Sequence, residues 1–129
     1  MAVLTPQEIK AILVTKGSFE GKDLSGSNLS SMNLAGFNLR KAVLKRATMR
    51  GAILERCDLR EADLSETKLE NARLKGADLE RANLKRADLR RANLEGANFE
   101  RADLTGANLE MVVLKGVNFG KAVLEKTIF

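Results

Sequence analysis

A large apolar residue recurs at every fifth position from Phe19 to Phe129. Leucine fills most of these positions, which we call the centre positions, and Phe or Met fills the others. An α-helix turns about 100° per residue, so a spacing of five would carry these side chains around the helix instead of along one face. A flat β-strand also fails, because an odd spacing puts successive side chains on opposite faces. The pattern therefore predicts a chain that turns a corner every five residues and stacks into a coil with the centre positions inside.

The other positions of the five-residue unit support this interpretation. Two residues before most centres lies a small residue, mostly alanine, with Cys57 and Thr67 as variants, and larger residues occur there only toward the ends; we call this the alanine position. Residues two apart in an extended segment share a face, so these side chains should also point inward. The residue between them, the Asx position, is usually Asp or Asn, whose side chains bond readily to nearby backbone. The two residues after each centre, the corner pair, are mostly charged or glycine and should form outward turns, where glycine permits positive φ.

The corner charges indicate how many units make one coil. Residues one coil apart lie about 4.8 Å from each other, where opposite charges attract and like charges repel. At a spacing of 20 residues opposite-charge pairs outnumber like pairs, whereas at a spacing of 15 the reverse holds. One series with strictly alternating sign at this spacing is Arg50, Glu70, Arg90 and Glu110. The sequence therefore predicts four units per coil, and so a coil with four sides.

These units resemble the pentapeptide-repeat family, whose consensus is Ala-(Asp/Asn)-Leu-X-X. The match is direct in runs such as residues 77–81 (ADLER) and 82–86 (ANLKR), and the resemblance extends over residues 17–129. It implies an all-β solenoid, namely a right-handed quadrilateral β-helix of about five to six coils. The handedness is implied by the resemblance alone. We expect one domain, with residues 1–16 as an N-terminal capping helix and residues 17–129 as the β-helix.

The N-terminal segment breaks the repeat and predicts a short helix. Thr5 at the N-cap, Pro6 at the first helical position and Glu8 three residues after the cap form a capping-box pattern. Apolar residues then follow at helical spacing: Ile9, Ile12 and Leu13. Gly17 is expected to end the helix. We expect this helix to cover the open end of the first coil, because an uncovered end exposes core and unpaired strand edges; binding a partner is the alternative role.

The C-terminal end shows no such cap, because the repeat continues to the last residue. The centre residues of the final coil would be Leu114, Phe119, Leu124 and Phe129. An open apolar end is an interface or an association hazard, so we predict that two chains form a homodimer through these four residues. The resemblance agrees, since family members that protect topoisomerases dimerise at their C-terminal ends.

The sequence offers no catalytic, cofactor-binding or metal-binding constellation. It has no histidine, one cysteine and no glycine-rich phosphate loop. Asp58 and Asp78 would stack in one column and could share a proton or a cation, but a ladder bonded to local backbone is the favoured interpretation. Cys57 should be a buried structural thiol. We therefore expect no enzymatic activity, no cofactor, and no catalytic or metal-site residues.

The net charge of +5 raises nucleic acid, or another anionic surface, as a partner. However, the basic pair Lys85 and Arg86 lies one coil from Glu66, and outward aromatic residues for base stacking are missing. A mutually paired, solvated surface is therefore favoured, and nucleic acid is not the expected partner. The resemblance implies a second alternative, because some pentapeptide-repeat proteins imitate the size and negative charge of DNA and modulate DNA gyrase. The leading interpretation is a solenoid that serves as a protein-interaction or scaffold module for an unknown protein partner.

The sequence also bears on localisation. No stretch approaches 18 apolar residues, so no membrane span is expected, and the N-terminus lacks the basic and apolar regions of a signal peptide. A single cysteine is compatible with a reducing compartment. We therefore expect a cytoplasmic protein.

Overall fold

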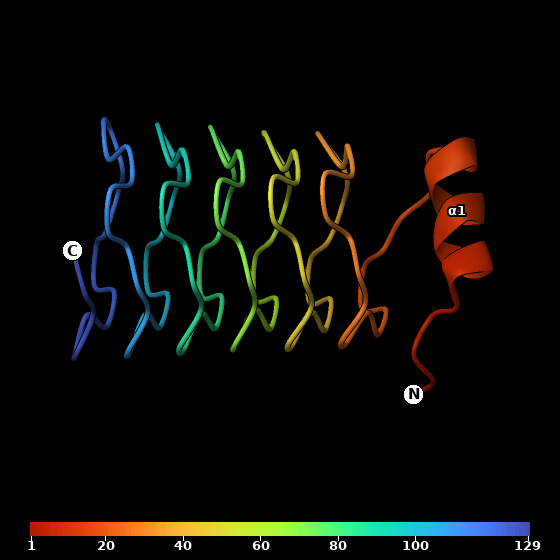
Figure 1. Ribbon diagram of the computed structural model, residues 1–129, viewed down its shortest axis with the longest axis horizontal. Coiled ribbons are helices and arrows are strands. Elements are labelled where there is room, and N and C mark those ends of the chain that lie inside the picture. The colour runs from red at the N-terminus through yellow and green to blue at the C-terminus, as the bar shows by residue number, and fades with distance from the viewer.

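A computed structural model describes all residues 1–129. The chain winds into a rod of stacked four-sided coils, and α1 (Pro6–Thr15) lies across its N-terminal end (Figure 1). Every β-bridge is parallel and joins residues 20 positions apart, from Val3–Asp23 to Asn108–Ile128. Each side of a coil contributes one isolated bridge, so no longer strand forms. The 20-residue coil is thereby confirmed. No helix in the structure has the length and apolar character needed to cross a membrane.

Each five-residue unit bonds to the coils on both sides and to itself. The N–H of Leu79 donates to the carbonyl of Asn98 in the next coil at 2.7 Å, and the N–H of Asp78 donates to Cys57 in the preceding coil at 3.0 Å. The corner is closed by the N–H of Ala82, which donates to the carbonyl of Leu79 at 3.0 Å. Because these bonds repeat along the rod, the backbone groups on the sides of interior coils are paired without long strands.

The core is a single column that runs through the centre of the coils. Centre residues from Phe19 to Leu109 are at most 1% exposed, and they form one cluster with the buried alanine positions. The two variants at the alanine position, Cys57 and Thr67, are buried as expected, and the Thr67 hydroxyl donates to the carbonyl of Leu64 at 2.7 Å. The inward orientation of both position types is therefore confirmed.

The second residue of every corner pair has positive φ, whether or not it is glycine. At Gly96 the angle is 68°, and at Arg56 it is 56°. The glycines of the corner pairs indicated this conformation in the sequence. The four-sided coil requires the same sharp turn at each corner, so Arg, Lys and Glu adopt it as well. A side chain with a Cβ atom is strained in this region, by roughly 1–2 kcal/mol.

This strain predicts that Arg56→Gly stabilises the fold, by up to about 1 kcal/mol, because glycine adopts positive φ without strain and only part of the gain is lost to entropy. Arg56→Ala is the matched control, since it removes the same charged side chain but keeps the Cβ atom. Urea unfolding at pH 7 measures both variants. Equal stability of the two would mean that the side chain, and not the backbone, determines the effect.

The N-terminal segment forms the expected cap. The Thr5 N–H donates to Glu8 Oε1 at 2.9 Å, and the Glu8 N–H donates to Thr5 Oγ1 at 3.1 Å, so the capping box is confirmed. Ile9 is buried, and Leu4 packs against the same core. The helix thus covers the apolar end of the first coil, as predicted for a solenoid cap.

Two details of this end differ from the sequence interpretation. The helix ends at Thr15, and Lys16 caps it with φ 54°, so the assignment of the stop to Gly17 was wrong by one residue. The left-handed conformation occurs at Lys16, because the chain leaves the helix there and enters the first coil. In addition, Val3 bridges Asp23, and the Leu4 N–H donates to the Asp23 carbonyl at 2.8 Å, so these two residues extend the ladder ahead of the helix.

Candidate functional site

The last coil differs from the others in the exposure of its centre residues. Leu114, Leu124 and Phe129 are 39%, 38% and 58% exposed. Phe119 is partly buried; its ring stacks on Phe99 with centroids 5.6 Å apart and meets Phe129 edge-on at 6.2 Å. The structure thus brings the four residues singled out in the sequence together on one face, which we call the terminal face.

Other apolar side chains enlarge the terminal face beyond the four centre residues. These exposed residues are Met111, Val113, Val123 and Ile128. Three of them occupy the Asx position, which in most units carries Asp or Asn. They were not predicted, because the five-residue period identifies only the inward positions of this coil. The replacement of Asx by β-branched residues was visible in the sequence, although Val43 and Ile53 show the same replacement within the rod.

The terminal face also presents unpaired backbone groups. In interior coils the N–H of each centre residue donates to the next coil, but the N–H groups of Leu114 and Leu124 have no acceptor. The carbonyls of Val112 and Ala122 likewise have no donor. Such a face has the properties of a sheet edge, at which another chain can pair.

Four corners frame the terminal face, and we number them along the chain: residues 110–111, 115–116, 120–121 and 125–126. Their charged residues are Glu110, Lys115, Lys121, Glu125 and Lys126. None of these five forms an ion pair within the chain, whereas corners of earlier coils form several. The rim therefore carries charges of both signs that are free to pair with another molecule.

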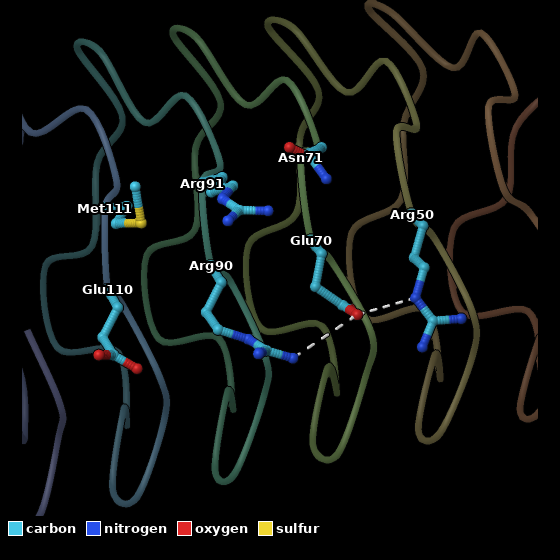
Figure 2. Close-up of a pocket in the computed structure, with 7 residues that line it drawn as sticks. All are labelled: Arg50, Glu70, Asn71, Arg90, Arg91, Glu110 and Met111. Carbon is cyan, nitrogen blue, oxygen red and sulfur yellow. Dashed lines mark hydrogen bonds and ion pairs between the residues drawn. The ribbon is translucent and has the colours of Figure 1, made fainter.

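A shallow groove of about 460 Å³ runs along the column of corners that ends at the first corner (Figure 2). Its lining comprises Arg50, Glu70, Asn71, Arg90, Arg91, Glu110 and Met111. Figure 2 shows Glu70 between two arginines: Glu70 Oε2 accepts from Arg50 Nε at 2.8 Å and lies 4.0 Å from Arg90 Nη2. The predicted pairing of charges 20 residues apart is confirmed here. Because opposite charges alternate along the groove, they largely neutralise one another.

The Asx side chains bond to local backbone throughout the rod. Every Asp or Asn at this position accepts the N–H two residues later. Asp78 also accepts from Asn98 Nδ2 at 3.1 Å, and Asn98 Oδ1 accepts from Asn118 Nδ2 at 3.2 Å. The backbone-bonded ladder is thereby confirmed. No group of three or more His, Cys, Asp or Glu side chains is placed to hold a metal ion.

Two of these carboxylates predict a pH dependence of stability. Hydrogen bonds from the Arg60 side chain lower the pKa of Asp58, and those from Arg90 lower the pKa of Asp88. Since the folded pKa lies below the unfolded value of about 4, the unfolded chain binds more protons in this window, and stability falls as the pH drops through the folded pKa. We expect a constant unfolding free energy from pH 7 to about pH 5 and a decline below about pH 4. The free energy of urea unfolding, measured across this pH range, tests this expectation.

The double variant Asp58→Asn, Asp88→Asn is the control for this pH series. Asparagine keeps the bond to the backbone N–H two residues later but does not titrate, so part of the acid sensitivity should disappear. An identical decline in the variant would assign the sensitivity to other carboxylates.

Cys57 lies in the core and offers no reactive thiol. Burial raises its pKa to about 12. Its Sγ donates to the Leu34 carbonyl at 2.8 Å. The thiolate form is therefore disfavoured at neutral pH, and the residue serves as a small apolar side chain.

The four-sided section, the 20-residue parallel ladder and the inward column of leucine define a right-handed quadrilateral β-helix. The family model for pentapeptide repeats matches residues 23–60, 57–96, 82–120 and 92–129, in 8 copies, and the chain belongs to this family. The handedness implied by the sequence resemblance is thereby confirmed.

Solved structures support the same assignment. The pentapeptide repeat protein Rfr23 from the cyanobacterium Cyanothece 51142 is 33% identical, with a TM-score of 0.81, and the match covers 95% of this chain and 97% of Rfr23. A pentapeptide repeat protein from the thylakoid lumen of Arabidopsis thaliana is 35% identical, with a TM-score of 0.60 over 68% of this chain and 65% of its own. QnrB1, a plasmid-mediated fluoroquinolone resistance protein, is 19% identical, with a TM-score of 0.54 over 84% of this chain and 65% of its own, and shows the fold alone. No curated protein sequence matches the chain.

Proposed function

We propose that this chain is a non-enzymatic protein-interaction module that forms a homodimer through its terminal face and leaves the sides of the rod for a further protein partner. The observation that carries the proposal is the terminal face itself. It combines exposed Leu114, Leu124 and Phe129 with unpaired N–H groups at centre positions, whereas every centre residue from Phe19 to Leu109 donates its N–H to the next coil. Apolar surface and unpaired ladder groups at one site favour association over exposure to water.

The structure of the two ends of the rod favours a second copy of the chain as the partner of the terminal face. The terminal face is itself a coil edge, so another coil edge is complementary to it in shape and hydrogen bonding. The opposite end of the rod is covered by α1, so head-to-tail stacking is obstructed (Figure 1). Two terminal faces can still meet around a two-fold axis, which gives a closed dimer and no open-ended fibre.

The mass of the 129-residue chain in solution tests this proposal. Sedimentation equilibrium at tens of micromolar should give a dimer, and Phe129→Lys should give a monomer with an unchanged circular dichroism spectrum. Val14→Lys is the matched control, because Val14 is an exposed apolar residue on the helix, away from the terminal face. A monomeric wild-type chain, or a monomeric Val14→Lys variant, would contradict the proposal.

The alternative interpretations have less support. A DNA-like surface should be negative, but the net charge is +5. Arginines such as Arg46 and Arg50 are paired with Glu66 and Glu70, which interrupts a continuous phosphate track. Assays of gyrase supercoiling and of salt-dependent DNA binding on the purified chain should therefore both show no effect at physiological salt.

A further inference from the structure

We infer that a ledge beside α1, formed by residues 26–35 of the first coil, binds an acidic peptide segment of another protein in an extended conformation. The inference goes beyond the proposed dimer and does not depend on it, because the ledge lies at the opposite end of the rod from the terminal face. It follows from the register of the first coil, from unpaired backbone groups, from two grooves and from the distribution of charge.

The ledge exists because α1 leaves the path of the coil. Leu4 is in register with the first coil, since its N–H donates to the Asp23 carbonyl at 2.8 Å, and the Phe19 N–H donates to the Asn38 carbonyl at 2.9 Å. Between them, the 10 residues of α1 take the place of the two five-residue units that would lie over residues 26–35. A helix of this length spans only about 15 Å, so it crosses the end directly and leaves two sides of the first coil without a neighbouring coil (Figure 1).

Each of these two sides carries a pair of unpaired backbone groups. In interior coils an Asx residue donates its N–H to the preceding coil and accepts an N–H from it at its carbonyl; Asp78 bonds in this way to Cys57 and Leu59. At Asn28 and Asn33 neither the N–H nor the carbonyl has a partner. An extended peptide can satisfy both groups, as in strand addition at a sheet edge. A phosphodiester backbone could not, because it has no donor to offer a carbonyl.

A groove lies along each of the two sides, between the ledge and α1. The first has a volume of about 470 Å³, and its lining includes Leu4, Ile9, Leu13, Asn28 and Met32. The second has a volume of about 610 Å³, and its lining includes Leu13, Asn33 and Phe37. Met32 and Phe37 replace the usual alanine and are only partly buried, so they offer apolar surface to a ligand. Each groove can therefore receive one large apolar side chain, which requires a peptide with two such residues about five positions apart, as in the coil.

The charge of this end of the rod determines the sign of the peptide. Residues 1–56 hold nine of the 22 basic residues and four of the 17 acidic residues, so the excess of +5 lies entirely in this part and residues 57–129 are neutral. Lys10 lines the first groove and Lys16 the second, and neither forms an ion pair within the chain. The ledge itself carries no charged residue. Acidic side chains of a bound peptide would therefore meet unpaired lysines and no carboxylate on the ledge.

Binding of a synthetic peptide tests the inference. The probe is ADLEEADLEE with blocked termini, which has its two leucines five positions apart and carries only acidic charges. NMR titration should shift the amide signals of Asn28 and Asn33 and slow their hydrogen exchange, because both N–H groups gain an acceptor. The unpaired N–H groups of Leu114 and Leu124 are the internal control and should not respond. Unchanged Asn28 and Asn33 signals, or an equal response at the terminal face, would overturn the inference.

Modified peptides test whether backbone pairing holds the ligand. Within the rod the N–H of a centre residue donates to the next coil, whereas the N–H of an Asx residue donates to the preceding coil. A peptide in the same register would therefore donate to the ledge from its leucine N–H groups and turn its aspartate N–H groups away. N-methylation of both leucines should weaken binding about tenfold, whereas N-methylation of both aspartates, the matched control, should have little effect. Equal affinities would show that charge alone attracts the peptide, and would refute strand addition.

Variants of the chain test the charge. The double variant Lys10→Gln, Lys16→Gln should weaken peptide binding about fivefold at low salt, since it removes both unpaired lysines of the grooves. Lys121→Gln, Lys126→Gln is the matched control, with the same change of charge at the other end of the rod, and should bind as the wild type does. Protection of Asn28 and Asn33 that rises with protein concentration in the absence of peptide would assign the ledge to a second copy of the chain and overturn the inference. A monomeric chain that binds the peptide at the ledge would support this inference while refuting the proposed dimer.

Discussion

Leu84→Asp is expected to unfold the coils around residue 84. Leu84 is 0% exposed and lies in a column between Leu64 and Leu104, so a carboxylate there would meet no water and no cation. An unpaired buried charge costs several kcal/mol, comparable to the whole stability of a small domain. Circular dichroism and one-dimensional NMR at 25 °C should show the loss of ordered structure.

Leu84→Ala is the milder version, and it should cost about 2–5 kcal/mol, because it leaves a cavity in a packed column. Leu124→Ala is the matched control: Leu124 lies in the same column but is 38% exposed and has a neighbouring coil on one side only. Its cost should be about 1 kcal/mol in the monomer, since less apolar surface is lost from the interior. Similar costs for the two variants would show that the terminal coil is covered in solution.

The fold could be predicted almost entirely from the sequence, for a physical reason. Each unit has the same pattern, so an outward residue such as Asp78 followed by an inward residue such as Leu79 occurs many times. A unit that departs from the pattern does not obscure it, because the neighbouring units repeat it. The coil length could also be predicted from the sequence. Residues one coil apart lie about 4.8 Å from each other, and at a spacing of 20 residues most charged corner residues, such as Arg50 and Glu70, have a partner of opposite sign. Each unit contacts only its neighbouring coils, so the fold can be predicted without knowledge of contacts between distant parts of the sequence, which an ordinary globular fold would require.

The details that sequence reasoning missed lie where the repeat meets something else. Lys16 adopts a left-handed conformation because the helix must turn into the first coil, and no local signal distinguishes it from Gly17. Val3 and Leu4 do lie 20 residues before Asp23 and Leu24, in phase with the repeat, but an intervening helix hides that relation. Such junctions depend on tertiary packing and not on the five-residue rule.

The candidate site was predicted in part. The inward positions of the last coil, such as Leu114 and Phe129, follow from the five-residue period. The contribution of the outward Val113 and Val123 was missed, because an apolar residue at the Asx position enlarges an apolar face only when exposed apolar residues surround it.

Undocking α1 is expected to convert the proposed dimer into open-ended fibres. Ile9 is the one helix residue that is fully buried, so Ile9→Asp should release the helix from the first coil. The edge beneath it has unpaired groups, because the N–H groups of Asn28 and Asn33 have no acceptor even with the helix in place. A second uncovered edge gives each rod two association faces, and association through both does not close.

Sedimentation velocity and negative-stain electron microscopy should then show rods much longer than a dimer. Lys10→Asp is the matched control, because it introduces the same carboxylate on the exposed side of the same helix. The double variant Ile9→Asp, Phe129→Lys should stop at small species, since fibre growth also needs the terminal face. A dimer that persists in Ile9→Asp would show that the first coil stays closed without the docked helix. Fibres in the double variant would show that growth does not pass through the terminal face. If both expected results are obtained, the asymmetry between a covered first coil and an open last coil is what limits this rod to two copies.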